Sequence, residues 1–181
     1  MDVEAELCRL EAQPLRRVAG WRPGWVRQCM PAVAEAAEQT RLWWAVAAVL
    51  AGRGVRGKRA ALAGLAAMAA AETVSNAVVK PLLQRRRPPE HLVPHDDVQD
   101  RPDSPSFPSG HTAAAAGFTA AVARVWPAAG ALCATAAGAV AVQRVHSGAH
   151  YPSDVVAGAA IGVATAESVR RLPRHVHRLI W

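Results

Sequence analysis

Three short stretches of this sequence end in residues that bind or attack phosphate. They are Lys80–Pro88, Pro108–His111 and Arg144–Asp154. Among their residues are the cations Lys80, Arg87 and Arg144, a Ser-Gly turn, the histidines His111 and His150, and a carboxylate, Asp154, four residues after His150. Phosphoryl transfer through a histidine needs cationic clamps, a nucleophile with an orienting acid, and a separate proton donor. The residue types and their order therefore predict a site that handles phosphate.

The second stretch predicts a loop that leads into a helix. Ser109 is a good helix N-cap, and the helix would begin near Gly110 and His111. The free backbone N–H groups and the positive dipole of such a helix start attract a phosphate oxygen. Gly110 also allows the backbone to approach a ligand closely. An ordinary loop-to-helix junction is the alternative for Pro-Ser-Gly alone, and the histidine directly after it favours the phosphate site.

The third stretch pairs a histidine with an acid. Pro152 disfavours helix at Tyr151 but suits a first helical turn, so His150 precedes a helix whose first turn holds Asp154. The carboxylate can accept a hydrogen bond from one imidazole nitrogen and leave the other to attack phosphorus. A capping or surface pair is the alternative for an isolated His-x-x-x-Asp. His146, in the same loop, has no carboxylate at this spacing and ranks below His150.

The first stretch supplies two cations at helical spacing. Lys80 and Arg87 are seven residues apart, about two helical turns, so they can share one face. Lysine is rare here, because only Lys58 and Lys80 are lysines among the 21 cationic residues. We expect Arg85 and Arg86 to be solvated or to contact lipid headgroups.

The order and spacing of the three stretches resemble the signature of the type 2 phosphatidic acid phosphatase superfamily. The family pattern reads Lys, six residues, Arg-Pro; then Pro-Ser-Gly-His; then Ser-Arg, five residues, His, three residues, Asp. Residues 80–154 meet every element except one, because Gln143 stands where a serine before Arg144 is usual. We expect this difference to cost a minor hydrogen bond and to leave the chemistry intact.

The resemblance assigns a role to each matching residue. It implies that His150 is the nucleophile that forms a phosphohistidine, that Asp154 orients it, and that His111 is the general acid for the leaving alkoxide. The implied phosphate cradle consists of Lys80, Arg87, Ser109, Gly110 and Arg144. No metal or other cofactor is expected, because these cations supply the charge that Mg²⁺ would otherwise supply.

The composition limits the class of protein. Its 181 residues fit one domain, with a formal charge of +7 and a pI of about 10.6, so a nucleic-acid binder must be considered. However, 19 of the 21 cations are arginine and alanine is abundant, which is typical of a GC-rich genome, and no nucleic-acid partner is expected. The acidic start, residues 1–7, does not resemble a cleavable signal peptide. The cysteines show no metal-ligand or disulfide spacing; they are Cys8, Cys29 and Cys133.

Apolar segments predict an all-α membrane protein. Mean hydropathy is only +0.06 and no window holds 18 strongly apolar residues, but alanine-rich segments recur along the chain. Alanine contributes little to membrane insertion, so such segments must pack cooperatively through their small residues. We predict a transmembrane helical bundle of about five spans, and a soluble alanine-rich bundle is the alternative. The predicted spans are Leu42–Gly52, Ala60–Val79, Thr112–Ala123, Val125–Gln143 and Val155–Val169.

The N-terminal part differs from the rest of the chain. Residues 14–30 mix arginines with tryptophans, are too polar to span a bilayer, and are interrupted at Pro23-Gly24. We predict an interfacial amphipathic segment over residues 1–40 and a single membrane-embedded phosphatase domain over residues 41–181. A solvated helix docked on that domain is the alternative for the N-terminal part. Residues 53–59 carry four cations among glycines, so we expect a turn at the membrane edge.

Five spans would place the three motif stretches on one side of the membrane, because two spans separate the second stretch from the third. Cations close to the spans number nine on the opposite side and six, outside the motifs, on this side. The positive-inside rule then predicts a multi-pass protein of the bacterial cell (inner) membrane with its active site outside the cytoplasm. The nine include cations of the basic tail Arg170–Arg178, which we expect at the membrane surface.

A polar stripe precedes Lys80 within its predicted span. Glu72 and Asn76 lie eight and four residues before Lys80, so a helix puts all three on one stripe. A glutamate within an apolar span is costly unless it faces the bundle interior. We predict that Asn76 neighbours the phosphate cradle and that Glu72 lies deeper. A Glu72 side chain that snorkels toward water is the alternative.

The motifs and the resemblance together predict a metal-independent lipid phosphatase that works through a phosphohistidine. Its substrate would be a phosphomonoester or diphosphate of a phospholipid or polyprenyl carrier, and its surroundings would be membrane lipids. One alternative is a soluble relative that shares the cradle, such as an acid phosphatase or a vanadate-dependent haloperoxidase. Another is a non-enzymatic basic membrane or nucleic-acid-binding protein whose motif is vestigial.

Overall fold

The alanine-rich sequence folds into helices throughout the described chain. The computed structural model describes residues 3–93 and 104–171, and within these residues the protein is all-helical, without a strand. The α-helices are α1 (Val3–Ala19), α2 (Gly24–Ala37), α3 (Arg41–Ala51), α4 (Gly54–Glu72), α5 (Lys80–Leu82), α6 (Gly110–Val125), α7 (Pro127–His146) and α8 (Pro152–Arg170). A π-helix over Thr73–Val79 joins α4 to α5, and short 3-10 helices cover Glu38–Thr40 and Glu90–Leu92.

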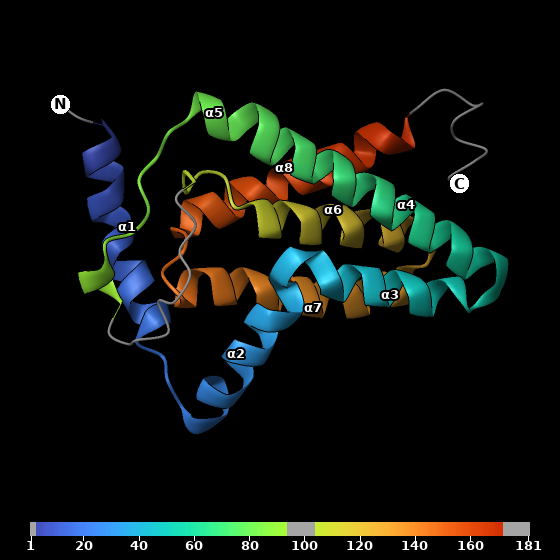
Figure 1. Ribbon diagram of the computed structural model, residues 1–181, viewed down its shortest axis with the longest axis horizontal. Coiled ribbons are helices and arrows are strands. Elements are labelled where there is room, and N and C mark those ends of the chain that lie inside the picture. Colours follow the sequence, from blue (N-terminus) through green and yellow to red (C-terminus); the bar gives the residue numbers. More distant parts are fainter. Residues whose placement is uncertain (1–2, 94–103, 172–181) are drawn as a thin grey trace.

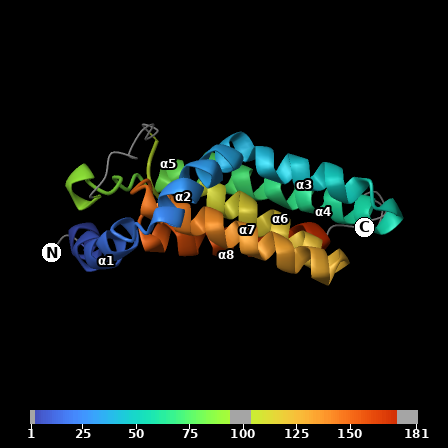
Figure 2. The ribbon, with the colours of Figure 1, turned by 90° about the horizontal axis from the view of Figure 1, so that it is seen from below.

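Helices α3, α4, α6, α7 and α8 lie roughly along the long axis of the molecule (Figure 1). Helix α6 is central, since it packs against α4, α7 and α8, while α3 packs on α4. Helix α1 lies at one end of this bundle, as the perpendicular view also shows (Figure 2). The five predicted alanine-rich segments correspond to α3, α4 with its continuation, α6, α7 and α8.

Glycines allow α8 to lie directly against α6. A Cβ added to Gly158 would stand 2.4 Å from the Ser109 carbonyl oxygen, and one added to Gly162 would stand 2.4 Å from the Ala113 carbonyl oxygen. Neither position therefore has room for a side chain. The Gly-xxx-Gly spacing brings the two backbones into contact, as in closely packed membrane helices. This contact fixes the distance between the starts of α6 and α8.

Larger side chains fill the core where α3 meets the bundle. Trp43 is almost fully buried, and its ring centroid lies 5.2 Å from that of Phe118 on α6. Met68 of α4 and Val122 of α6 belong to the same buried cluster. Aromatic side chains bury much area per residue, so they anchor α3 on a core that is rich in alanine.

Helix α4, the π-helix and α5 form one continuous stretch, Gly54–Leu82, that leads to the first motif. The stretch begins earlier than predicted. Gly54 has a φ of +79°, a left-handed conformation that glycine adopts readily, so the expected turn over residues 53–59 is only two residues long. The π-helix ends directly before Lys80. Such segments are rare and often occur at functional sites.

The N-terminal part folds into two helices that are broken before Pro23-Gly24, as the sequence predicts. Its acidic start is also helical, because α1 begins at Val3. Leu15 and Ala19 of α1 are fully buried in a cluster that includes Val145 and Tyr151. Helix α1 is therefore docked on the end of the bundle.

Two helical stretches in the described chain are long and apolar enough to cross a membrane: Gly54–Leu82 and Pro127–His146. This is consistent with a membrane protein, but it does not confirm five spans. Helices α3 and α6 have only 11 and 16 residues, and α8 carries three charged residues, Asp154, Glu167 and Arg170. Large apolar side chains are nevertheless exposed around the bundle, among them Val49, Leu62, Leu82, Leu132, Val156 and Val163.

Candidate active site

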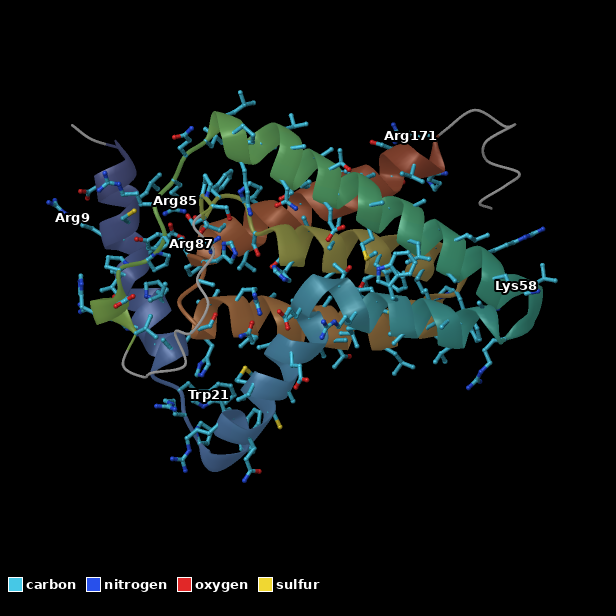
Figure 3. The ribbon with its side chains drawn as sticks, in the orientation of Figure 1. Arg9, Trp21, Lys58, Arg85, Arg87 and Arg171 are labelled. Carbon is cyan, nitrogen blue, oxygen red and sulfur yellow. The ribbon has the colours of Figure 1, made fainter. Side chains whose placement is uncertain are left out.

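The motif stretches meet at the end of the bundle that α1 covers. The ends of α5 and α7 and the starts of α6 and α8 all lie there (Figure 1). Figure 3 shows Arg85 and Arg87 at this end, whereas Lys58 and Arg171 lie at the opposite end. The structure therefore brings the three stretches together at one end of the bundle, and their place relative to a membrane stays a prediction.

Backbone hydrogen bonds join the three stretches to one another. The Ser109 N–H donates to the Asp154 carbonyl oxygen at 2.9 Å, which connects the second stretch to the third. The Ser106 N–H donates to the Arg85 carbonyl oxygen at 2.9 Å, which connects the segment before the second stretch to the first. The site is thus built on contacts between main chains, which hold it more firmly than side-chain packing alone.

The start of α6 is enclosed by polar groups. Ser109 is fully buried and occupies the N-cap position, but its hydroxyl pairs with Thr112 Oγ1 at 3.0 Å instead of capping a backbone N–H. Gly110 faces Asn76, because a Cβ added to Gly110 would stand 2.8 Å from the Asn76 side-chain oxygen. Asn76 thus neighbours Gly110 but is exposed instead of facing the bundle interior, and its role in turnover stays a prediction. Glu72, the deeper member of the stripe, is half-buried.

A backbone carbonyl fixes the imidazole of His150. Its Nδ1 lies 2.7 Å from the Ser106 carbonyl oxygen, and its own backbone N–H donates to the Arg144 carbonyl oxygen at 3.2 Å. Because a carbonyl oxygen can only accept, Nδ1 carries the proton in the neutral ring. Nε2 then holds the lone pair, which is the requirement for a nitrogen nucleophile.

Asp154 is completely buried, and both of its carboxylate oxygens have partners. Oδ1 accepts from Arg85 Nη1 at 2.7 Å, and Oδ2 accepts from the Tyr151 N–H at 2.8 Å. Oδ2 lies 3.7 Å from His150 Nδ1, an ion-pair distance that is too long for a hydrogen bond. The structure thus differs from the expected pairing, because the Ser106 carbonyl takes the orienting hydrogen bond and Asp154 acts on the imidazole through its charge.

The surroundings favour a neutral imidazole beside an ionised carboxylate. Burial, the largest cause, lowers the pKa of His150; the charge of Arg87 lowers it further, and Asp154 opposes both. Burial alone would raise the pKa of Asp154, but its hydrogen-bonded and charged neighbours outweigh that effect and hold the pKa below its ordinary value. His150 is therefore unprotonated at neutral pH.

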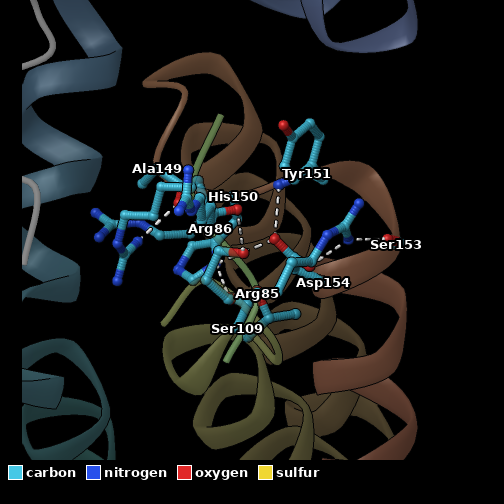
Figure 4. A network of polar contacts seen from close by, with 12 residues as sticks. Arg85, Arg86, Ser109, Ala149, His150, Tyr151, Ser153 and Asp154 are labelled. Atoms are coloured by element: carbon cyan, nitrogen blue, oxygen red, sulfur yellow. Dashed lines mark hydrogen bonds and ion pairs between the residues drawn. The ribbon is translucent and has the colours of Figure 1, made fainter. Parts of the chain in front are cut away.

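Arg85 is a site residue that the sequence analysis missed. Instead of being solvated, its side chain is only 11% exposed, and its Nη1 contacts Asp154 Oδ1 and the Ser153 hydroxyl at 2.7 Å each. Nη2 donates to Glu11 at 2.5 Å, and the guanidinium lies 4.2 Å from the centroid of the Tyr151 ring. Figure 4 draws the contacts that join Arg85, Ser153 and Asp154. The expectation that Arg85 is solvated was wrong, whereas Arg86 is exposed as expected.

Arg87 connects the first stretch to the residue that precedes His150. Its Nη1 donates to the Ala149 carbonyl oxygen at 2.7 Å, and its Nε donates to the Ser104 carbonyl oxygen at 3.0 Å. Both contacts place the guanidinium beside the third stretch. Its assignment to the phosphate cradle stays a prediction.

His111, in the second stretch, lies within electrostatic range of titratable groups from the first and third stretches. Its pKa is lowered to about 3, first by burial and then by neighbouring titratable groups. Those groups are Arg144, His150, Lys80 and Arg87. The three cations of the predicted cradle therefore act electrostatically on one imidazole. A phosphate dianion is the ligand whose charge would offset this concentration of cations.

Gln143, which replaces the usual serine, contacts Arg144. Arg144 Nε donates to Gln143 Oε1 at 2.5 Å, and the glutamine is almost completely buried. The carboxylate of Glu38, which directly follows α2, adds a favourable electrostatic interaction with Arg144. The sequence predicts that Arg144 loses a hydrogen bond because Gln143 replaces the usual serine. In the structure Gln143 itself accepts a hydrogen bond from Arg144.

Ser106 is the second site residue that sequence reasoning missed. Besides its backbone contacts to Arg85 and His150, its hydroxyl donates to the Arg86 carbonyl oxygen at 3.1 Å. Ser106 therefore joins the first stretch to the imidazole. Two of its three contacts use backbone atoms, so no pattern of residue types could have indicated them.

His146 is buried in the docking of α1. Its Nδ1 lies 3.0 Å from the Val18 carbonyl oxygen of α1. This contact agrees with its lower rank as a nucleophile. The last part of the basic tail, residues 172–178, lies outside the described residues.

The fold and the site together define the class of protein. A sequence profile of the PAP2 superfamily matches residues 60–177. The chain belongs to the PAP2 superfamily, the family that its motifs resemble.

A solved structure shares the fold over nearly the whole chain. It is described as the first transmembrane PAP2 type phosphatidylglycerolphosphate phosphatase from Bacillus subtilis. The TM-score is 0.64 at 19% sequence identity, and the match covers 93% of this chain and 90% of that chain. A search of curated proteins finds no match. Membership of the family supports a phosphatase, and the solved structure shows that its fold is shared.

Proposed function

We propose that this protein is a metal-independent membrane lipid phosphatase that works through a phosphohistidine on His150. Its substrate is a phosphomonoester or diphosphate of a phospholipid or polyprenyl carrier. The observation that carries the proposal is the Ser106 carbonyl on His150 Nδ1, because it leaves the lone pair on Nε2 beside a group of cations. Membership of the PAP2 superfamily supports the same class of reaction.

In the first half-reaction, Nε2 of His150 attacks phosphorus and the bond from phosphorus to the leaving oxygen breaks. The electron pair of that bond stays on the oxygen, which takes a proton from His111. A bound phosphate dianion raises the pKa of His111, because its charge offsets the cations that lower the pKa in the free enzyme. The cations stabilise the charge on the five-coordinate phosphorus; they are Lys80, Arg87 and Arg144.

In the second half-reaction, water attacks the phosphohistidine. Neutral His111 takes the proton of this water, and the bond between phosphorus and Nε2 breaks with its electron pair returning to the nitrogen. Inorganic phosphate leaves, and both histidines return to their starting protonation states. The phosphorylated imidazole carries positive charge, which the ionised Asp154 offsets from 3.7 Å.

The proposed orientation follows from the distribution of cations. Lys58 and Arg171 lie at the end of the bundle opposite Arg85 and Arg87 (Figure 3), and exposed arginines accompany them there. Under the positive-inside rule this end faces the cytoplasm of the bacterial cell, and the active site faces the other side of the inner membrane. A lipid phosphate can then reach the site from the outer leaflet, while exposed apolar side chains contact the membrane core.

The test measures phosphate release by the full chain purified in detergent. The substrates are phosphatidate, phosphatidylglycerophosphate, undecaprenyl diphosphate and other polyprenyl phosphates, each assayed in excess EDTA with and without orthovanadate. We expect at least one lipid to be hydrolysed in EDTA and vanadate to inhibit, since it mimics five-coordinate phosphorus. Protein recovered in the soluble fraction without detergent would instead favour a soluble acid phosphatase.

Two results would contradict the proposal. Absence of phosphate release from every lipid would favour a non-enzymatic membrane protein. Loss of activity on chelation that Mg²⁺ restores would overturn the metal-free mechanism.

A further inference from the structure

Glu11 of α1 contacts Arg85, a partner of the Asp154 carboxylate, and Ser153, the residue before Asp154, although Glu11 lies before the region that the family profile matches. Its Oε1 accepts from the Ser153 N–H at 2.7 Å, and its Oε2 accepts from the Ser153 hydroxyl at 2.9 Å. Oε2 also accepts from Arg85 Nη2 at 2.5 Å. Both oxygens of Glu11 are therefore directed at the residues that surround Asp154.

Arg85 closes the connection from Glu11 to Asp154. Its Nη2 donates a hydrogen bond to Glu11, and its Nη1 donates one to Asp154 Oδ1 at 2.7 Å, so one guanidinium bridges two carboxylates. The side chains are 14% exposed for Glu11, 11% for Arg85 and 0% for Asp154. Water screens such contacts poorly, and a planar guanidinium with several fixed donors orients both partners at once.

Glu11 also completes the start of α8. The first helical N–H groups have no partner within the helix, and the N-cap residue Tyr151 provides no side-chain hydrogen bond to them. The carboxylate of Glu11 supplies an acceptor to the Ser153 N–H from a different helix, at the positive end of the α8 dipole. Asp154 is the next residue, so this contact limits how the first turn of α8 can move.

We infer that Glu11 is a positioning residue of the active site: through Arg85 and Ser153 it holds the Asp154 carboxylate beside His150. The inference rests on the proposed function for its consequence in turnover. Helix α1 is then part of the catalytic apparatus as well as a docking element.

The charges around this network determine the expected effect of removing Glu11. Two carboxylates flank one guanidinium, and the other titratable groups that face it are Cys8 on α1 and Tyr151 before α8. Beyond Asp154 lies His150, on which Arg87 also acts. Neutralising Glu11 makes the potential at His150 more positive, so the imidazole loses its proton at a lower pH.

The test compares Glu11→Gln, Glu11→Ala and the control Glu6→Gln in the full chain. Gln at position 11 keeps an acceptor for the Ser153 N–H but loses the charge, whereas Glu6 is exposed on the same helix and pairs with exposed Arg9 at 3.7 Å. Turnover is measured on an activated aryl phosphate. Binding of inorganic orthovanadate is measured as a function of pH, because it requires an unprotonated His150.

We expect Glu11→Gln to lower kcat about 10-fold without raising KM, since a misplaced Asp154 acts on the chemical step. The acid limb of vanadate binding should move to lower pH by roughly half a unit, the effect of one screened charge. A purely structural contact would not move that limb. Glu6→Gln should match the wild type in both measurements. If Glu11→Gln also matches the wild type in both, the inference is overturned.

A third measurement separates this inference from the proposed function. If wild-type protein neither hydrolyses aryl phosphate nor binds vanadate, the phosphohistidine proposal fails. Hydrogen–deuterium exchange then tests separately whether Glu11 positions the start of α8. Faster exchange over residues 150–156 in Glu11→Ala than in Glu6→Gln would show that Glu11 holds this segment. Equal exchange in the two variants would overturn the positioning role.

Discussion

Both ends of the bundle hold acidic residues surrounded by arginine, yet the two clusters lie in opposite environments. At the site end, Glu11 and Asp154 share Arg85, and the three side chains are at most 14% exposed. At the far end, Glu167 is 27% exposed, and its partners are 43–72% exposed. Those partners are Arg124, Arg170 and Arg171.

The difference shows that burial, and not residue type, separates functional arginines from background arginines in this chain. Exposed ion pairs contribute little, because water and salt screen them. Buried pairs depend on one another, since removal of one partner leaves an uncompensated charge in a poorly solvated place. In an arginine-rich chain the number of cations therefore does not indicate where the site lies. A buried arginine with fixed hydrogen-bond partners, such as Arg85, does indicate it.

The largest expected effect at the site end is that of His150→Ala. Turnover should fall by more than about 1000-fold, because no other group in the site can form the covalent intermediate. The measurement is phosphate release from the best lipid substrate. His91→Ala is the control, since His91 is exposed. Substantial activity in His150→Ala would move the nucleophile to another residue.

His111→Ala should have a smaller effect that depends on the leaving group. We expect a loss of about 100-fold or more with alkyl phosphates and a much smaller loss with activated aryl phosphates, whose leaving group needs no proton. The measurement is kcat with both substrate types. Equal losses on the two would assign His111 another role.

Arg85→Met tests the buried cluster against the exposed one. The substitution leaves Glu11 and Asp154 facing each other without a shared cation, so we expect a loss of about 3 kcal/mol in the free energy of unfolding. We also expect turnover to fall roughly 30-fold. Unfolding in detergent and phosphate release measure the two effects. Arg171→Met is the matched control at the far end, and the comparison fails if both variants behave alike.

The pH profile of turnover should show how the surroundings of His150 lower its pKa. His150 attacks only when it is neutral, and its lowered pKa means that the neutral form persists below the ordinary histidine value of about 6.5. We therefore expect kcat/KM to stay level below pH 6.5 and to fall only in more acidic solution. Arg87→Met removes one cause of the lowered pKa and should move this acid limb upward. An acid limb at or above pH 6.5 in the wild type would contradict the expectation.

The smallest effect should come from Glu167→Gln at the far end. Its partners are solvated, so we expect the unfolding temperature and the turnover to remain within experimental error of the wild type. Any difference should disappear at high ionic strength, because salt screens exposed charges. A salt-resistant loss of stability would show that the far cluster is as interdependent as the buried one.

The helices and the meeting of the motifs could be predicted from the sequence. Each alanine-rich segment became one helix, because its composition and the glycine and proline residues between segments define where helices run and stop. The number of spans between motifs then required the three stretches to lie on one side. The count of five membrane spans stays unconfirmed, because only two helical stretches of the described chain are long and apolar enough to cross a membrane.

The parts of the site that could not be predicted depend on contacts between distant residues or on the backbone. Arg85 contacts Glu11 and Asp154, which are 74 and 69 residues away in the sequence, so no local spacing indicates either partner. The Ser106 carbonyl has no side-chain signature at all. The hydroxyl of Ser109 was expected to cap α6, but burial beside Thr112 gave it another partner.

The glycine contact between α6 and α8 has a consequence for how the site responds to heat. The helix that carries the candidate proton donor and the helix that carries the candidate carboxylate meet backbone to backbone at Gly158, with a hydrogen bond of 2.9 Å between Ser109 and Asp154. Rotamer motions of side chains grow on warming, but no rotatable side chain sets this spacing. Temperature should then change the reaction rate through the chemical barrier, while the distance between the two helix starts stays constant until the bundle unfolds.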